Sequence, residues 1–292
     1  MIDLFLDYLR YERNKSQLTV RKYEMALQSF EAYFRDMDCS LSWATVDADV
    51  IRSWMESMMD NGKQATTVNG YLSAVRSFYR FALMRHLVDK DPAHHVKGPK
   101  KQKPLPAYVK EGEMDRLLDT LEWGDSLEDR RDRAILTTFY ETGVRVSELV
   151  GLDDSDVDFA QGQLKVTGKR NKQRIVPFGQ ELADELRIYI KVRDEQLPRP
   201  DAALFVTLKG TRLNIWQAER IVKRHLTKVT TQKKRTPHVL RHSFATAMLN
   251  HDASLEGVKN LLGHESVATT EIYTHTTFEQ LKRVYKQAHP RG

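Results

Sequence analysis

The sequence predicts a mainly α-helical protein with one small antiparallel β-sheet, divided into a helical N-terminal domain and a mixed α+β C-terminal domain. Apolar residues recur at steps of three and four through the first ninety residues. Apolar and polar residues alternate in one stretch near the middle of the chain, which is typical of a β-hairpin. A segment rich in proline and lysine separates the two patterns.

The first domain, expected over residues 1–90, is interpreted as a compact bundle of four helices. One helix is expected to begin after Asp47, a good N-cap residue, and to stop at Asn61 and Gly62. The helices on either side of it each carry five regularly spaced apolar residues, which are Val20, Tyr23, Leu27, Phe30 and Phe34 in one and Val68, Leu72, Val75, Phe78 and Tyr79 in the other. These residues are expected to form the core of the domain.

Residues 91–110, "DPAHHVKGPKKQKPLPAYVK", are expected to link the two domains. The segment holds four prolines and five lysines, and no acidic residue follows Asp91. Prolines at this density are incompatible with a helix, and few residues are available for burial. The linker is either a solvated tether or a basic strap that lies along a phosphate backbone, and the two interpretations are compatible.

The second domain, expected over residues 111–292, mixes helices with a hairpin. Helical patterns cover residues 111–121, 129–141, 180–197 and 214–230, and shorter helices follow residue 236. The hairpin is "QLKVTGKRNKQRIVPF", and its tip is expected to hold the basic residues Lys169, Arg170, Lys172 and Arg174. The last segment, 277–287, is amphipathic, with Phe278, Leu281 and Tyr285 on one face.

Composition and charge limit the class of protein. Of the 292 residues, 40% are hydrophobic and 29% charged, and no apolar run is long enough for membrane insertion. The single cysteine, Cys39, excludes an internal disulfide and a multi-cysteine zinc cluster, so a reducing cytoplasm is the expected location. The net charge of +6 comes entirely from residues 100–292, because basic and acidic residues balance in residues 1–99. A basic domain is typical of nucleic-acid binding.

The segment "TPHVLRHSFATAML" at 236–249 admits three interpretations, namely a zinc site, a phosphate site or a structural helix. His238 and His242 have the spacing of a helical zinc motif, but Val239 stands where that motif needs its glutamate, and the charge of Arg241 would oppose a metal ion. His238 and Arg241 lie beside an apolar face in the first turn of the helix, where an anion is favoured. We therefore expect a phosphate site without a metal or other cofactor, with His242 structural.

Further candidate residues occur on both sides of this helix. Arg145 follows the helix-ending Gly143, and an arginine at a helix start is unfavourable unless an anion lies there. With His238 and Arg241, the complete candidate set is Arg145, Lys169, His238, Arg241, His264 and Tyr273. Two arginines can bind one phosphate, a tyrosine can act as nucleophile, and lysine and histidines can transfer protons. The expected chemistry is phosphoryl transfer from DNA to a tyrosine.

At these residues the sequence resembles the tyrosine recombinases of the phage integrase superfamily, and within it the Xer group. The resemblance covers nearly the whole chain and depends on "TGVRVSELVGL", "VTGKRNKQRIVP", "TPHVLRHSFATAML", "LLGHESVATTEIYTH" and the tail "HPRG". It implies a SAM-like core-binding domain for the N-terminal helices and a catalytic domain for the rest. The family's active site then coincides with the six candidate residues.

The resemblance also implies a role for each of these residues. Tyr273 would attack the scissile phosphate, form a 3′-phosphotyrosyl link and release a 5′-hydroxyl, which then attacks the partner strand through a Holliday junction. Arg145 and Arg241 would hold the phosphate, while His264 would donate a hydrogen bond to it. Lys169 would protonate the leaving oxygen, and His238 would assist proton transfer.

The partners implied by the resemblance are DNA and further recombinase molecules. Double-stranded DNA with a specific recombination site would be held in a C-shaped clamp, to which Arg76, Arg80 and Arg85 could offer a basic face. Four protomers, identical or including a second Xer-like recombinase, would assemble on two sites, and each would pass helix 277–287 to a neighbour. The alternative for that helix is packing on its own domain. A septal DNA translocase is an expected activator from the resemblance alone.

The expected function is the resolution of chromosome or plasmid dimers, and therefore chromosome partition during the cell cycle. One alternative is an integrase or excisionase of a mobile element. Such enzymes often carry an additional N-terminal domain, whereas the helical domain here begins at Met1, so the Xer role is favoured. A second alternative, from another class, is a DNA-binding protein that has lost catalysis, and the intact candidate set argues against it.

Overall fold

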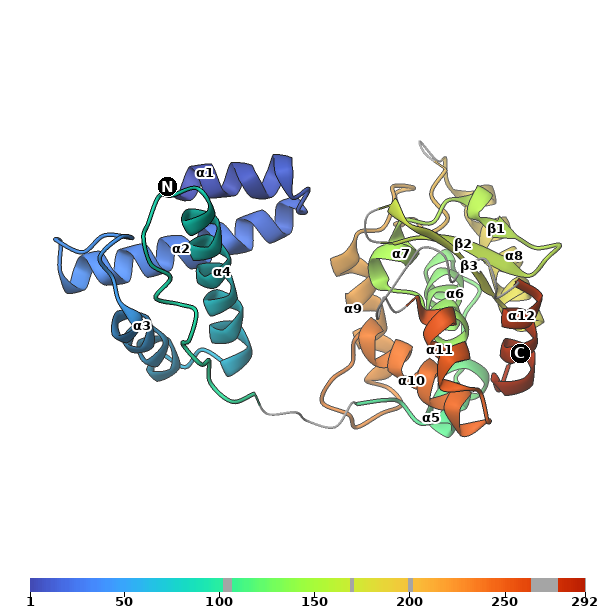
Figure 1. Cartoon of the computed structure of the whole chain (residues 1–292). Helices are drawn as coiled ribbons and strands as arrows, with labels where there is room; N and C mark the ends of the chain where they lie inside the picture. The colour runs from blue at the N-terminus through green and yellow to red at the C-terminus, as the bar shows by residue number, and fades with distance from the viewer. Residues whose placement is uncertain (102–106, 169–170, 199–201, 264–277, 292) are drawn as a thin grey trace. The chain divides into compact units, whose positions relative to one another are not determined.

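The computed structural model describes residues 1–101, 107–168, 171–198, 202–263 and 278–291, with side chains omitted at 278–280. The chain forms two compact units, Met1–Pro104 and Leu105–Gly292 (Figure 1). The described residues are mainly helical, with one three-stranded antiparallel sheet. The fold class predicted from the sequence is therefore confirmed.

The described residues of the first unit form four α-helices. They are α1 (Ile2–Asp7), which continues as a π-helical turn (Tyr8–Glu12), α2 (Gln17–Met37), α3 (Ala48–Asp60) and α4 (Ala65–Met84). The Asp47 carboxylate caps α3 by accepting from the amides of Asp49 and Val50, as its position predicts. Aromatic rings fill the interior, and the rings of Trp43 and Phe78 lie 4.3 Å apart between centroids. The predicted four-helix bundle is confirmed.

The part of residues 91–110 that follows α4 packs against the first unit instead of remaining solvated. Ala93 and Val96 are buried in its core. The Arg76 guanidinium donates hydrogen bonds to the carbonyls of both residues, and the Asn69 side-chain amide donates to the carbonyl of Pro99 at 2.9 Å. Of the described residues in this segment, only Ala93, Val96 and Val109 are buried, as the expectation of few buried residues requires, and the first two are enough to anchor the chain here.

This anchoring also changes the expected basic face of the first unit. Arg76 is directed at the backbone of residues 93–96, and the guanidinium of Arg85 pairs with Glu12 at 2.5 Å. Arg80 is exposed. Of the three arginines proposed for DNA contact, Arg76 therefore has a structural role.

The second unit places its helices around a small sheet. The helices are α5 (Glu111–Asp115) with a following π-helical turn (Arg116–Thr120), α6 (Leu127–Thr142), α7 (Val146–Val150), α8 (Gln180–Gln196), α9 (Ile215–Leu226), α10 (Pro237–Asn250), α11 (Leu255–Leu262) and α12 (Phe278–Ala288). The strands are β1 (Val157–Asp158), which follows a 3-10 turn (Asp154–Asp156), β2 (Gln163–Thr167) and β3 (Gln173–Pro177), in the order β1-β2-β3.

The predicted hairpin is formed by β2 and β3. Leu164 pairs with Val176, and Val166 pairs with Arg174. Arg174 therefore lies within β3 and not at the tip, so its predicted place at the tip is wrong. The strand β1 was not predicted, since two residues carry no periodicity.

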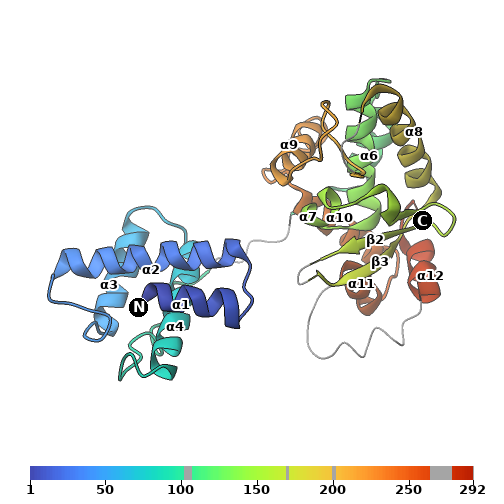
Figure 2. The same ribbon diagram turned by 90° about the horizontal axis from the view of Figure 1, so that it is seen from above.

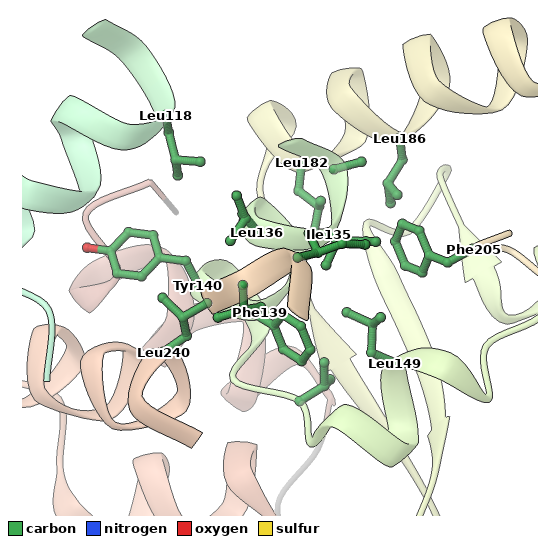
Figure 3. Close-up of a cluster of buried hydrophobic side chains, with 14 of the residues drawn as sticks. Leu118, Ile135, Leu136, Phe139, Tyr140, Leu149, Leu182, Leu186, Phe205 and Leu240 are labelled. Atoms are coloured by element: carbon green, nitrogen blue, oxygen red, sulfur yellow. The ribbon is translucent and has the colours of Figure 1, made fainter. Parts of the chain in front are cut away.

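Helix α6 is the centre of the second unit. Its residues Ile135 and Phe139 are fully buried and pack against α7, α8 and α10, as Figure 3 shows with Leu149, Leu186 and Leu240 among the labelled side chains. The helix ends at Gly143, so its position fixes where Arg145 begins the next element. None of the described helices has the length and apolar character needed to span a membrane.

Candidate active site

Arg145 is placed by a tight turn between α6 and α7. Gly143 ends α6 with φ of +58°, a left-handed conformation that favours glycine. A Cβ atom at Gly143 would lie 2.6 Å from Cδ1 of Phe244, so no larger residue fits. The turn brings Arg145 to the N-cap of α7, with its side chain 36% exposed.

The anion at the start of α7 is a carboxylate of the protein itself. Glu148 lies three residues after Arg145, and its side chain is 1% exposed. Its Oε2 accepts from the Arg145 backbone amide at 2.8 Å, and its Oε1 accepts from the Arg145 guanidinium, also at 2.8 Å. The positive charge of Arg145 at the start of a helix is unfavourable by itself. The Glu148 carboxylate compensates for it.

A second arginine, Arg174 from β3, binds the same carboxylate. Its two terminal nitrogens donate to Oε1 at 2.7 Å and to Oε2 at 2.9 Å, which is a bidentate arrangement. Burial alone would raise the pKa of Glu148, but the hydrogen bonds and charge of Arg174, together with the bonds from Arg145, outweigh it and hold this pKa below its ordinary value. Glu148 is therefore ionised at neutral pH.

Arg241 approaches the same region from α10. Its guanidinium donates to the carbonyl of Gly143 at 2.6 Å and to that of Leu262 at 2.6 Å, and the residue is 4% exposed. Burial, followed by the positive charges of Arg145 and Arg174, lowers its pKa to about 10. Arg241 therefore remains charged at neutral pH, in an electrostatic field that disfavours further positive charge.

All three arginines meet at the C-terminal end of α11. Arg174 donates from Nε to the carbonyl of Leu261 at 3.3 Å, Arg241 to that of Leu262, and Arg145 to that of Gly263 at 3.1 Å. The last carbonyls of a helix lack partners within the helix and carry partial negative charge. In Figures 1 and 2, α7 and α11 lie beside the β2–β3 hairpin, as these contacts require.

The arginine cluster, which we define as Arg145, Arg174, Arg241 and Glu148, has an excess of positive charge. Three guanidinium groups and one carboxylate leave a net charge of +2 on this cluster. Because the Arg145 side chain is partly exposed, solvent and ligands can reach at least one guanidinium. Such an arrangement is suited to binding an anion with several oxygens, such as a phosphate.

The two histidines of α10 lie next to each other. The ring centroids of His238 and His242 are 4.7 Å apart in an edge-on arrangement; His238 is exposed and His242 is half-buried. Burial, followed by the charges of His238 and Arg241, lowers the pKa of His242, so this ring is neutral at pH 7. Among the described residues, no group of three or more His, Cys, Asp or Glu is placed to hold a metal ion.

The structure describes half of the predicted site. Arg145 and Arg241 are brought together at the end of α11, and His238 lies three residues before Arg241 on α10. Lys169, His264 and Tyr273 lie outside the described residues, and their roles stay predictions.

Sequence reasoning missed two members of the arginine cluster, Glu148 and Arg174. The three-residue spacing between Arg145 and Glu148 is that of a capping box, which was a usable signal for the first of them. Arg174 was recognised only as part of a basic hairpin. Its partner is 26 residues away in the sequence, so the contact depends on tertiary structure.

Comparisons with known proteins agree with this architecture. Residues 107–280 match the phage integrase family, and residues 2–86 match the phage integrase N-terminal SAM-like domain. The chain is 37% identical to the tyrosine recombinase XerC of Chlorobaculum tepidum, over 99% of this chain and 94% of that protein. It is 36% identical to the tyrosine recombinase XerD of Oceanobacillus iheyensis, over 100% of this chain and 98% of that protein.

Solved structures show the same fold. The crystal structure of XerA recombinase has a TM-score of 0.50 at 30% identity, covering 100% of this chain and 98% of that one. The XerH site-specific recombinase bound to difH substrate has a TM-score of 0.71 at 23% identity, covering 97% and 83%. The chain therefore belongs to the phage integrase family and is an Xer-like tyrosine recombinase, an enzyme that cuts and rejoins DNA strands.

Proposed function

We propose that this enzyme recombines DNA at specific sites and resolves chromosome or plasmid dimers. The single observation that carries the chemical part is the convergence of Arg145 and Arg241 on adjacent carbonyls, those of Gly263 and Leu262. Two guanidinium groups this close can share the oxygens of one phosphate. The relationship to XerC and XerD over the full chain supports the biological part.

In the proposed reaction, the two arginines stabilise the transition state at phosphorus. Each guanidinium has five N–H donors, so Arg145 can keep its bonds to Glu148 and Gly263 and still donate to a phosphate oxygen. Negative charge on the nonbridging oxygens increases as phosphorus becomes five-coordinate, and preorganised cations stabilise that charge more than the ground state.

The covalent steps follow from the family's chemistry. The Tyr273 hydroxyl attacks phosphorus and gives up its proton with the assistance of His238, and the bond from phosphorus to the 5′-oxygen breaks. Lys169 protonates that leaving oxygen, and His264 donates a hydrogen bond to the phosphate. The 5′-hydroxyl of the partner strand then attacks the 3′-phosphotyrosine and releases Tyr273. The phosphoester bond is conserved at each step, so the reaction needs no cofactor.

A second surface supports the proposal of DNA binding. Trp216 on α9 is 63% exposed, and the Arg220 guanidinium lies 5.5 Å from the centre of its indole ring. These residues border a cavity of about 370 Å³, which is also lined by Glu128 and by Arg131 and Arg224, two arginines that pair with the carboxylates of Glu128 and Asp132. We propose that Trp216 and Arg220 on this face of α9 contact DNA, where the Arg220 guanidinium can neutralise a backbone phosphate.

Assembly on DNA would involve helix α12. In the single chain, α12 packs on its own unit, with Tyr285 and Ala288 buried against Phe244 and Leu262. We propose that in a tetramer on two recombination sites the same surface accepts the 277–287 helix of a neighbouring protomer. The tetramer would consist of four copies or include a second Xer-like recombinase. It would work in the cytoplasm at the nucleoid, with a septal DNA translocase as its activator.

The test is covalent capture of DNA. Protein–DNA adducts that survive SDS would be isolated from cells making the wild-type or the Tyr273→Phe protein, and the attached DNA would be sequenced. We expect adducts at one chromosomal or plasmid site in the wild type and none in the variant. Adducts at the ends of a mobile element would instead identify an integrase.

The captured site then tests catalysis directly. A nicked duplex of that sequence should give a gel-shifted adduct with the wild type, and Arg241→Lys should abolish the adduct while preserving DNA binding. Binding without any adduct from the wild-type protein would contradict the proposal and indicate an inactive DNA-binding protein.

A further inference from the structure

Arg174 is the described arginine of the cluster to which neither the sequence nor the proposed reaction assigns a role. It lies in β3, and its side chain is 10% exposed. Its guanidinium bonds to both oxygens of Glu148 and to the carbonyl of Leu261. Its aliphatic part lies under Gly263, where a Cβ atom would come within 2.9 Å of the Arg174 Cδ. The residue therefore connects three elements, β3, α7 and α11.

We propose that Arg174 is a positioning residue, which holds Glu148 and the end of α11 so that Arg145 is aimed at the scissile phosphate. This inference deepens the proposed function and rests on it. Arg174 itself does not touch the substrate in this account.

The donors around Glu148 are shared between two arginines. Each carboxylate oxygen accepts one bond from Arg145 and one from Arg174. Without Arg174, Arg145 would be the only one of these two arginines left to compensate the buried Glu148 carboxylate. Because a buried charge must be compensated, the carboxylate would then draw the Arg145 guanidinium toward itself and away from a ligand.

Arg174 also changes the net charge around Arg145. Arg145 and Glu148 alone form a neutral pair, which would attract a phosphate only weakly. Arg174 supplies a second positive charge to the same carboxylate. The charge of Arg145 therefore remains available to the incoming anion.

The contacts of Arg174 also depend on the shape of its side chain. Two parallel bonds to one carboxylate and a third bond from Nε to Leu261 require the planar fork of arginine. A lysine has a single nitrogen and cannot make all three contacts. The conservative variant Arg174→Lys therefore keeps the positive charge and removes the geometry.

The kinetic test uses the nicked duplex identified by adduct capture. We expect Arg174→Lys to slow single-turnover adduct formation by about 100-fold, because small misplacements of a catalytic group have effects of this size. The apparent Kd for the duplex should stay close to that of the wild type. Arg187→Lys is the matched control, since Arg187 forms an exposed ion pair with Asp184 on α8.

Comparison with Arg145→Lys separates positioning from a general structural defect. If Arg174 acts through Arg145, the double variant should be no slower than Arg145→Lys alone. Multiplication of the two rate losses would overturn the inference, as would wild-type rates for Arg174→Lys.

A measurement without DNA keeps this inference distinguishable from the proposed function. Hydrogen–deuterium exchange of the full-length protein should increase in peptides covering 143–151 and 255–263 for Arg174→Lys, and not for Arg187→Lys. Unchanged exchange would show that Arg174 holds neither element. If no DNA gave an adduct even with the wild type, the proposed function would fail, and exchange would still decide whether Arg174 holds α7 and α11.

Discussion

Two buried glutamates, seven residues apart, lie on either side of the turn between α6 and α7. Glu148 is bonded by two arginines, which keep its pKa below the ordinary value despite burial. Glu141 has no arginine in hydrogen-bond contact among the described residues. Its Oε2 accepts from the Gly179 amide at 3.1 Å and from the Tyr285 hydroxyl at 3.0 Å, and burial raises its pKa to about 8.

The difference shows that contact with arginine, more than burial, decides the charge of each carboxyl group. Ionised Glu148 organises the arginines of the site, whereas Glu141 is protonated at neutral pH and binds the C-terminal helix α12 through Tyr285. Next to it, buried His289 donates from Nε2 to the carbonyl of Tyr140 at 3.2 Å. The two sides of one turn therefore combine a charged centre with a neutral docking surface.

The largest expected effect comes from removing the charge of Glu148. Glu148→Gln leaves Arg145, Arg174 and Arg241 without their counter-charge, which should lower the free energy of unfolding by about 3–5 kcal/mol. Urea titration followed by circular dichroism measures this. Exposed Glu195 on α8 gives the control Glu195→Gln. A loss equal to that of the control would contradict the role of Glu148.

Glu141→Gln should raise the free energy of unfolding relative to the wild type, by an amount that depends on pH. The unfolded chain loses this proton near pH 4.5, while the folded protein keeps it up to about pH 8. The stability that Glu141 contributes is therefore complete below pH 4.5 and is lost as pH rises through 8. Relative to the wild type, the variant should gain roughly 3 kcal/mol between pH 5 and pH 8. If the stabilities of the variant and the wild type ran parallel from pH 5 to pH 8, Glu141 would be ionised in the folded protein.

Buried His289, on the same docking surface, should make the protein less stable at acidic pH. Burial lowers its pKa from 6.5 to about 3, so its contribution is present above pH 6.5 and is lost as pH falls toward 3. At pH 5 the loss should be roughly 2 kcal/mol. His289→Gln keeps a donor for the Tyr140 carbonyl and should remove this part of the acid sensitivity. A variant as acid-sensitive as the wild type would exclude the assignment.

The smallest expected effect concerns a third buried carboxylate, Asp132. It is bonded by Arg131 and His225 in the interior and by Arg224, whose side chain is 47% exposed. Arg224→Gln should lower the free energy of unfolding by less than about 1 kcal/mol, because exposed ion pairs contribute little. A loss as large as that of Glu148→Gln would show that exposure does not distinguish the two clusters.

The sequence was sufficient for the helical periodicity, the caps and the hairpin, because these depend on residues close together in the chain. Gly143 was predicted to end a helix, and it has the left-handed conformation there. The contacts of Arg174 with Glu148 and Leu261 could not be predicted, since they join segments 26 and 87 residues apart. Arg76 was misassigned for the same reason, as its partners lie in the following segment.

The domain boundaries and the complete six-residue site both stay predictions. The structure divides the chain at Pro104 and Leu105, within the segment expected to be a linker. It brings Arg145 and Arg241 together, while the positions of Lys169, His264 and Tyr273 relative to them are not described.

The most direct measurement is a structure of the Tyr273→Phe protein bound to its captured recombination site. We expect the guanidinium groups of Arg145 and Arg241 each to lie about 2.7–2.9 Å from a nonbridging oxygen of the same phosphate. Arg174 should still hold Glu148 in that complex. Two arginines bound to different phosphates, or either one turned away from the DNA, would contradict the central claim.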